Sequence, residues 1–202
     1  MLKLNLYELN KYYSFQNTPI FSARELVVIF DSNKRAVNGF LSYNVSKGRI
    51  IRLKAGLFTL ANIAVNDFTI ANKLYFPSYI SLDTALSYYN LIPETVYSIT
   101  SVTSKSTKEF ETMNKRFAYF KIKKDAFLGY GPVMLEGEIV YIAHSEKAVA
   151  DMLYLNFLKK REYNDRMDWS KINLNKLKSY LKLFSKKGLI NYSMSKFKEY
   201  DQ

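Results

Sequence analysis

Apolar residues recur at helical spacing at the start of the chain. Leu2, Leu6, Leu9 and Tyr13 lie three or four residues apart, and Pro19 follows them. Residues on one face of an α-helix repeat with this period, and proline interrupts a helix. The pattern therefore predicts a first helix over residues 1–15.

Two further helices are predicted directly after this one. Ser22 and Glu25 have the spacing of a capping box, and the flanking Phe21 and Leu26 form a hydrophobic staple, so a helix is expected over residues 22–30. A third helix is expected from residue 33 to about residue 47. Its expected cap is Ser32, and its expected end is Gly48.

The third predicted helix has two different faces. Its apolar positions fall on one side and are Val37, Phe40, Leu41 and Val45. Its polar positions fall on another side and are Lys34, Arg35, Asn38 and Ser42. Arginine and asparagine reach base edges with two hydrogen bonds, and lysine and serine reach phosphate, so this composition suits a helix in the major groove of DNA.

A cationic hairpin is predicted to follow. The runs 49–53 and 57–60 have strand composition, and Lys54-Ala55-Gly56 joins them. Three helices followed by such a hairpin predict a winged helix-turn-helix over residues 1–65. The alternative is a solvated helical bundle that carries a β-hairpin.

The remaining residues, 66–202, are expected to form a mixed α+β domain. From Phe68 the pattern indicates short strands and turns, and Ser81 opens a helix that runs through Tyr89. Strands are predicted where β-branched and aromatic residues gather, at 96–103, 117–122 and 139–143. Ser145 is expected to cap a helix over 146–158.

A basic amphipathic helix is predicted near the end of the chain, from Leu174 to Lys187, between Asn173 and Gly188. Its apolar stripe is Leu174, Leu177, Leu181 and Phe184. Another face carries Asn175, Lys178, Lys182 and Lys186. The lysines form a possible second surface for DNA or an acidic partner, and solvation is the simpler interpretation.

The net charge of +12 favours a polyanionic partner. Residues 1–65 carry a net +6, residues 66–158 a net −1, and residues 159–202 a net +7. A chain with 23 Lys and 16 Asn also fits the codon bias of an AT-rich genome. Four of the seven arginines nevertheless lie in the first 65 residues, namely Arg24, Arg35, Arg49 and Arg52.

Composition excludes several classes of protein. With no cysteine, the chain has no disulfides and no thiol nucleophile, which fits the cytoplasm. A single histidine makes a zinc site or a serine triad hard to assemble. The apolar runs are short, so neither a membrane span nor an export signal is expected.

Enzymatic chemistry finds little support in the sequence. The chain lacks a phosphate loop, a dinucleotide fingerprint and the Asp-x-Asp pair of nucleotidyltransferases, so no metal or cofactor is expected. Glu136 and Glu138 are expected in a hairpin turn, and Glu109 and Glu111 in a polar stretch. His144 is expected to be structural. Lys147 and Asp151, four residues apart, are expected to form a surface ion pair.

Four ordered stretches between residues 49 and 151 resemble the AbiEi antitoxins of type IV toxin-antitoxin systems in abortive-infection operons. They are Arg49 to Phe58 (RIIRLKAGLF), Tyr79 to Tyr89 (YISLDTALSYY), Tyr97 to Lys105 (YSITSVTSK) and Ile142 to Asp151 (IAHSEKAVAD). The resemblance implies an N-terminal winged helix that binds operator DNA. It also implies a following domain that antagonises a nucleotidyltransferase-like toxin, in a protein that represses its own operon.

The leading hypothesis is therefore a DNA-binding antitoxin and repressor that acts without catalysis. In this hypothesis Arg35 and Asn38 read bases. The residues expected to hold phosphate or reach the minor groove are Lys34, Ser42, Arg49, Arg52 and Lys54. The alternatives are a stand-alone winged-helix regulator or a protein-interaction module without antitoxin activity, and last an enzyme that uses Glu136 and Glu138.

Overall fold

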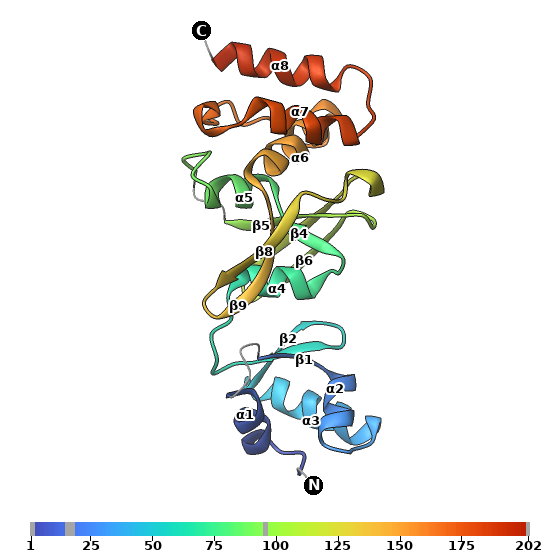
Figure 1. Cartoon of the computed structure of the whole chain (residues 1–202). Coiled ribbons are helices and arrows are strands. Elements are labelled where there is room, and N and C mark those ends of the chain that lie inside the picture. The colour runs from blue at the N-terminus through green and yellow to red at the C-terminus, as the bar shows by residue number, and fades with distance from the viewer. Residues whose placement is uncertain (1–2, 15–18, 95–96, 201–202) are drawn as a thin grey trace.

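A computed structural model describes residues 3–14, 19–94 and 97–200 of the chain. The described residues form a mixed α+β fold with eight α-helices, two short 3₁₀ helices and two β-sheets. Figure 1 shows these elements arranged along one long axis, with the N-terminal helices at one end and the C-terminal helices at the other. The larger sheet lies between the two ends.

The N-terminal region consists of three helices and a small sheet. In chain order its elements are α1 (Leu6–Ser14), β1 (Ile20–Ser22), α2 (Ala23–Ile29), α3 (Lys34–Ser46), β2 (Ile50–Lys54) and β3 (Leu57–Leu60). The sheet is antiparallel with the order β1-β3-β2. The predicted helices and hairpin are present, and β1 is a strand that the sequence pattern did not indicate. The predicted first helix began at Met1 and ended at Phe15, and both residues lie outside the described part of the chain.

Caps fix where α2 and α3 begin. Ser22 accepts a hydrogen bond from the backbone of Glu25, whose carboxylate accepts one from the Ser22 backbone, so the predicted capping box is confirmed. Asn33 caps α3, with its side-chain oxygen 2.8 Å from the Ala36 nitrogen. The prediction that Ser32 is this cap is wrong, because α3 begins one residue later than expected.

The small sheet contributes its two faces to two different cores. Phe21, Ile50 and Phe58 lie in the core formed with α1, α2 and α3. Ile20 and Leu53 point the other way and belong to the core of the larger sheet. Because alternate residues of a strand face opposite sides, this division follows from the strand period of two.

The larger sheet has six strands in the order β6-β7-β5-β4-β9-β8. In chain order they are β4 (Ser78–Ile80), β5 (Ser98–Thr103), β6 (Lys108–Thr112), β7 (Lys115–Lys121), β8 (Tyr130–Leu135) and β9 (Glu138–Ala143). Strand β5 pairs with β7 in parallel, as β4 does with β9, and the remaining pairs are antiparallel. The three strands predicted from β-branched and aromatic residues correspond to β5, β7 and β9, although Val96 lies outside the described residues.

Helices cover this sheet and complete the chain. They are α4 (Asp67–Leu74), α5 (Leu82–Tyr88), α6 (Ser145–Phe157), α7 (Leu174–Leu183) and α8 (Leu189–Tyr200), with 3₁₀ helices at Lys124–Ala126 and Trp169–Lys171. Figure 1 shows α4 on the side of the sheet that faces the N-terminal region, whereas α5 and α6 lie on the side of α7 and α8.

Three parts of the sequence prediction for this region are wrong. Ser145 does not cap the helix expected over 146–158, because α6 begins at Ser145 itself and His144 holds the N-cap position. Residues 67–74 form α4 rather than strands and turns, capped by Asn66, with Ile70 and Leu74 buried. The predicted helix to Lys187 ends at Leu183, and a separate helix, α8, follows Gly188. Apolar packing that no local pattern reports stabilises these helices, on the sheet for α4 and on α6 for α7 and α8.

Candidate nucleic-acid interface

One face of α3 presents polar side chains to solvent. Its exposed polar residues include the four expected from the sequence, Lys34, Arg35, Asn38 and Ser42, whereas Val37 and Leu41 are buried. None of the four forms a hydrogen bond or ion pair through its side chain within the described part of the chain. The face is therefore free to bind an external partner.

The charges at the start of α3 do not stabilise the helix. Lys34 and Arg35 lie in the first turn, which contains no acidic residue. The N-terminus of a helix carries a partial positive charge, so cations there are unfavourable and anions are favourable. The placement of Lys34 and Arg35 therefore opposes the helix dipole, and no carboxylate pairs with either cation within the described residues.

The two hairpin arginines lie in different places. Arg52 is exposed, and its guanidinium lies 5.6 Å from the ring centre of Phe58, on the side of the small sheet that faces the helices. Arg49 follows the C-terminal end of α3 and lines a shallow pocket with Leu6 and Asn10 of α1. The two ends of the 13-residue α3 are about 20 Å apart, so Arg49 is separated from Arg35.

Lys54 lies at the junction between the two sheets. Its ammonium donates a hydrogen bond to the backbone oxygen of Leu74 at the end of α4, at 2.5 Å. Burial lowers the pKa of Lys54, and the nearby charges of Lys108 and Lys105 lower it further. Lys54 is therefore not part of the α3 surface, although the sequence grouped it with the residues there.

The basic residues of α7 are far from α3. Lys182 and Lys186 are exposed and Lys178 is half-buried, at the end of the molecule opposite α1, α2 and α3 in Figure 1. Their helix packs on α6 through Leu177 and Leu181. The lysines of α7 and the polar face of α3 are therefore two separate basic surfaces.

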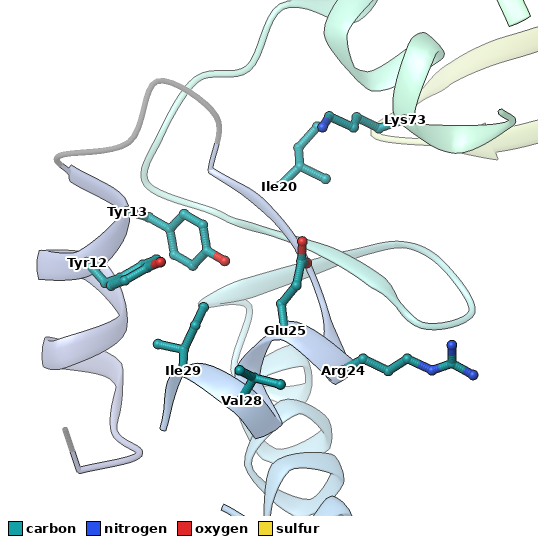
Figure 2. A pocket seen from close by; sticks show the side chains of 8 residues that line it. All are labelled: Tyr12, Tyr13, Ile20, Arg24, Glu25, Val28, Ile29 and Lys73. Carbon is teal, nitrogen blue, oxygen red and sulfur yellow. The ribbon is translucent and has the colours of Figure 1, made fainter. Parts of the chain in front are cut away.

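A pocket of about 560 Å³ opens beside α2. Figure 2 shows its lining, with aromatic and aliphatic side chains from α1, β1 and α2 on its walls and two cations, Arg24 and Lys73, at its rim. Val28 in the wall is 79% exposed. Glu25 also lines the pocket. In the described part of the chain neither cation lies within ion-pair distance of a carboxylate, so the pocket combines apolar surface with two cations and one acid.

The Lys147–Asp151 pair is buried, which corrects the expectation of a surface ion pair. Both side chains are fully shielded from solvent, and Asp151 also accepts hydrogen bonds from Tyr79 Oη at 2.9 Å and Ser81 Oγ at 2.8 Å. Burial lowers the pKa of Lys147 and raises that of Asp151, whereas the pairing opposes both shifts. Because both side chains are fully buried, the pair links α6 to β4, and a substrate cannot reach it.

The carboxylates considered as metal ligands do not gather. Glu136 lies with Gly137 in the tight turn between β8 and β9, as expected, whereas Glu138 is the first residue of β9 and not part of the turn. Glu109 lies on β6 and pairs with Arg116, and His144 Nδ1 lies 2.9 Å from Tyr180 Oη. Within residues 3–14, 19–94 and 97–200, no three histidine, aspartate or glutamate side chains are grouped as metal ligands are.

No helix among the described residues has both the length and the apolar character needed to cross a membrane. This finding agrees with the absence of long apolar runs in the sequence.

Sequence reasoning missed two groups of cations. Arg24 and Lys73 come together only in the fold, because α2 and α4 are far apart in the chain. Lys105 and Lys108 lie beside Lys54. The alternating sequence Lys108-Glu109-Phe110-Glu111 indicated a strand with Lys108 on its less acidic face. On a strand this alternation places the lysine and the phenylalanine on one face and both acids on the other.

Comparison with models of known protein families gave no match, and comparison with curated proteins gave none either.

Proposed function

We propose that the N-terminal region is a winged helix-turn-helix that binds operator DNA. In this proposal α3 enters the major groove, and the β2–β3 hairpin is the wing. The observation that carries the proposal is the unpaired polar face of α3, with two cations placed against the helix dipole. The element order of three helices interleaved with a three-stranded antiparallel sheet supports it.

Each residue of this face has a distinct role in the proposal. Arg35 and Asn38 read base edges, for which guanidinium and amide groups are suited. Lys34, Ser42 and Arg52 hold phosphates and set the position of the helix. Arg49 lies too far along α3 to share the same contact and is assigned to flanking backbone.

The experiment is a fluorescence-anisotropy titration against the DNA upstream of the gene and against scrambled DNA of equal length, at two salt concentrations. Tighter binding of the upstream DNA, retained at the higher salt, is expected. Arg35→Glu should abolish this preference and leave the fold intact by circular dichroism. The matched control is Lys186→Glu, a charge reversal at the far end of the molecule, which should leave binding unchanged.

Substitutions by alanine separate base reading from phosphate binding. Asn38→Ala should reduce the ratio of specific to scrambled binding, whereas Lys34→Ala should weaken both to a similar degree. If Arg35→Glu binds the upstream DNA as the unchanged protein does, the assignment of α3 as the reading helix is wrong.

We further propose, from the resemblance to AbiEi antitoxins, that the protein represses its own operon and antagonises a nucleotidyltransferase-like toxin without catalysis. Co-expression with such a toxin encoded beside the gene tests this part. Restored growth is expected, and Arg35→Glu distinguishes direct antagonism, which survives the substitution, from repression, which does not. Unrestored growth with the unchanged protein contradicts the antitoxin role and leaves a stand-alone regulator.

A second candidate function is a protein-interaction module, which the pocket beside α2 favours. Its apolar walls with Arg24 and Lys73 at the rim suit an acidic segment with apolar side chains (Figure 2). In this case DNA binding is weak, falls steeply with salt and shows no preference for the upstream sequence. Val28→Glu, placed in the exposed wall, would then disrupt the partner complex and leave DNA binding unchanged.

A further inference from the structure

Three lysines converge at the junction between the hairpin and the larger sheet. Lys54 comes from β2, Lys108 from β6, and Lys105 from the connection between β5 and β6. Their ammonium groups lie over two aromatic rings, those of Tyr75 and Phe110, at distances of 5.1 to 5.9 Å from the ring centres. The ring centres are 6.0 Å apart, so the lysines share one small surface, called here the junction cluster.

The fold holds these lysines in place. Lys54 donates to the Leu74 carbonyl, and Lys105 donates to the Phe76 carbonyl at 2.7 Å. The ring of Tyr75 packs edge-on against Tyr119 in the sheet. Two of the three ammonium groups are therefore anchored, and the third, that of Lys108, lies over both rings.

Negative charge is absent from this surface in the described part of the chain. No lysine of the junction cluster lies within ion-pair distance of a carboxylate there. Glu109 and Glu111 are close in sequence, but strand alternation turns them to the opposite face, where Glu109 pairs with Arg116. Burial lowers the pKa of Lys54, and the charges of Lys108 and Lys105 lower it further, which agrees with the close approach of the three ammonium groups.

The cluster is continuous with the hairpin. Lys54 is the last residue of β2, two residues after Arg52. Thr112 at the end of β6 reaches the Arg52 carbonyl at 3.4 Å, so β6 lies along the hairpin. Arg52 and Lys54 lie on opposite faces of the small sheet, but β2 is an edge strand of that sheet. A phosphate backbone that passes over this edge therefore meets Arg52 on one side and the junction cluster on the other. Lysine binds phosphate as a point charge and gives no base preference.

We propose that the junction cluster is a second phosphate-binding site, which takes the DNA backbone beside the segment that α3 reads. This assignment rests on the DNA-binding function proposed above. It extends the contact from the N-terminal region onto the larger sheet, so both parts of the chain hold the DNA. The site contributes affinity and salt dependence and leaves sequence preference to α3.

The test is a titration of the full chain with the upstream duplex and with scrambled duplex over a series of salt concentrations. The variant is Lys105→Gln with Lys108→Gln, and Lys54 is kept because its ammonium also bonds to the Leu74 carbonyl. Each phosphate contact adds about 0.9 to the slope of log K against log salt, so the slope should fall by about 1.8. Affinity at low salt should fall at least tenfold for both duplexes, with their ratio unchanged.

The matched control is Lys187→Gln with Lys198→Gln, which removes two exposed lysines from the C-terminal end of the molecule. Its slope should equal that of the unchanged protein, which shows that net charge alone does not produce the effect. Circular dichroism and thermal unfolding check that all variants are folded.

The outcomes separate this proposal from the proposed function. An unchanged slope in the Lys105/Lys108 variant, together with lost preference in Arg35→Glu, overturns the junction cluster and supports the role of α3. A reduced slope together with an unaffected Arg35→Glu overturns the role of α3 and supports a cluster that binds DNA without sequence preference. A Lys105/Lys108 variant that loses the ratio between the duplexes contradicts the assignment to backbone contact.

Discussion

The arginines of the N-terminal region and those of the rest of the chain are used differently. Arg24, Arg35, Arg49 and Arg52 form no ion pair within the described residues, whereas Arg116, Arg161 and Arg166 each pair with a carboxylate. The ion pairs found in the described residues all lie between Asp67 and Glu199. The arginines of the larger part are paired within the protein, whereas those of the N-terminal region are left to solvent or to a partner.

This difference has a physical basis in composition. The first 65 residues carry nine basic and three acidic residues, so most of their cations have no carboxylate to meet. One of the three acids, Glu25, is already bound in the capping box of α2. The contrast teaches that net charge alone does not locate a binding surface, and that unpaired charge does.

The largest effect is expected where a charge is paired and buried. Lys147→Met leaves Asp151 in the core without its cation, so the free energy of unfolding should fall by about 3 to 5 kcal/mol. Urea denaturation followed by circular dichroism measures the change. The double variant Lys147→Met, Asp151→Asn removes both charges and keeps acceptors for Tyr79 and Ser81, so it should be more stable than the single variant. A loss below about 1 kcal/mol in Lys147→Met contradicts the buried pair.

The burial of this pair also shows where sequence reasoning failed. The spacing of Lys147 and Asp151 is typical of an exposed helix face, and the spacing alone favoured the surface. The residues between them, Ala148, Val149 and Ala150, leave no polar face on this turn, and a helix that is apolar all round is buried. The apolar residues between Lys147 and Asp151 therefore indicated burial, whereas the spacing of the pair did not.

Local signals predicted the N-terminal elements well for the opposite reason. The capping box of Ser22 and Glu25 acts within one turn, so its effect is visible in sequence. The faces of α3 follow from helical period alone, and the structure exposes the polar set that this period indicates. The position of Lys54 depends on contact with Leu74, twenty residues away, which no local pattern reports.

A crossed pair of arginine substitutions tests the comparison directly. Arg35→Ala should lower affinity for the upstream DNA by about 1 to 3 kcal/mol and leave the free energy of unfolding unchanged. Arg161→Ala should leave DNA affinity unchanged and lower the free energy of unfolding by about 1 to 2 kcal/mol. It removes the ion pair with Asp83 and the contact between the guanidinium and the Phe120 ring, whose centre is 4.7 Å away. Anisotropy titration and urea denaturation are measured on both variants. Equal effects of the two variants on either readout would remove the distinction between free and paired arginines.

The smallest effect on stability is expected at Lys34, the first residue of α3. A charge that suits the proposed DNA contact there is unfavourable for the helix. Lys34→Glu places an acid in a first turn that contains none, so the helix dipole should raise the free energy of unfolding by about 0.3 to 1 kcal/mol. The same change puts a negative charge on the face proposed to meet phosphate, so DNA affinity should fall. Lys47→Glu at the other end of α3 is the matched control, and there the dipole predicts a small loss of stability. If Lys34→Glu lowers the free energy of unfolding as Lys47→Glu does, contacts within the protein stabilise Lys34. Its charge is then not available to bind a partner.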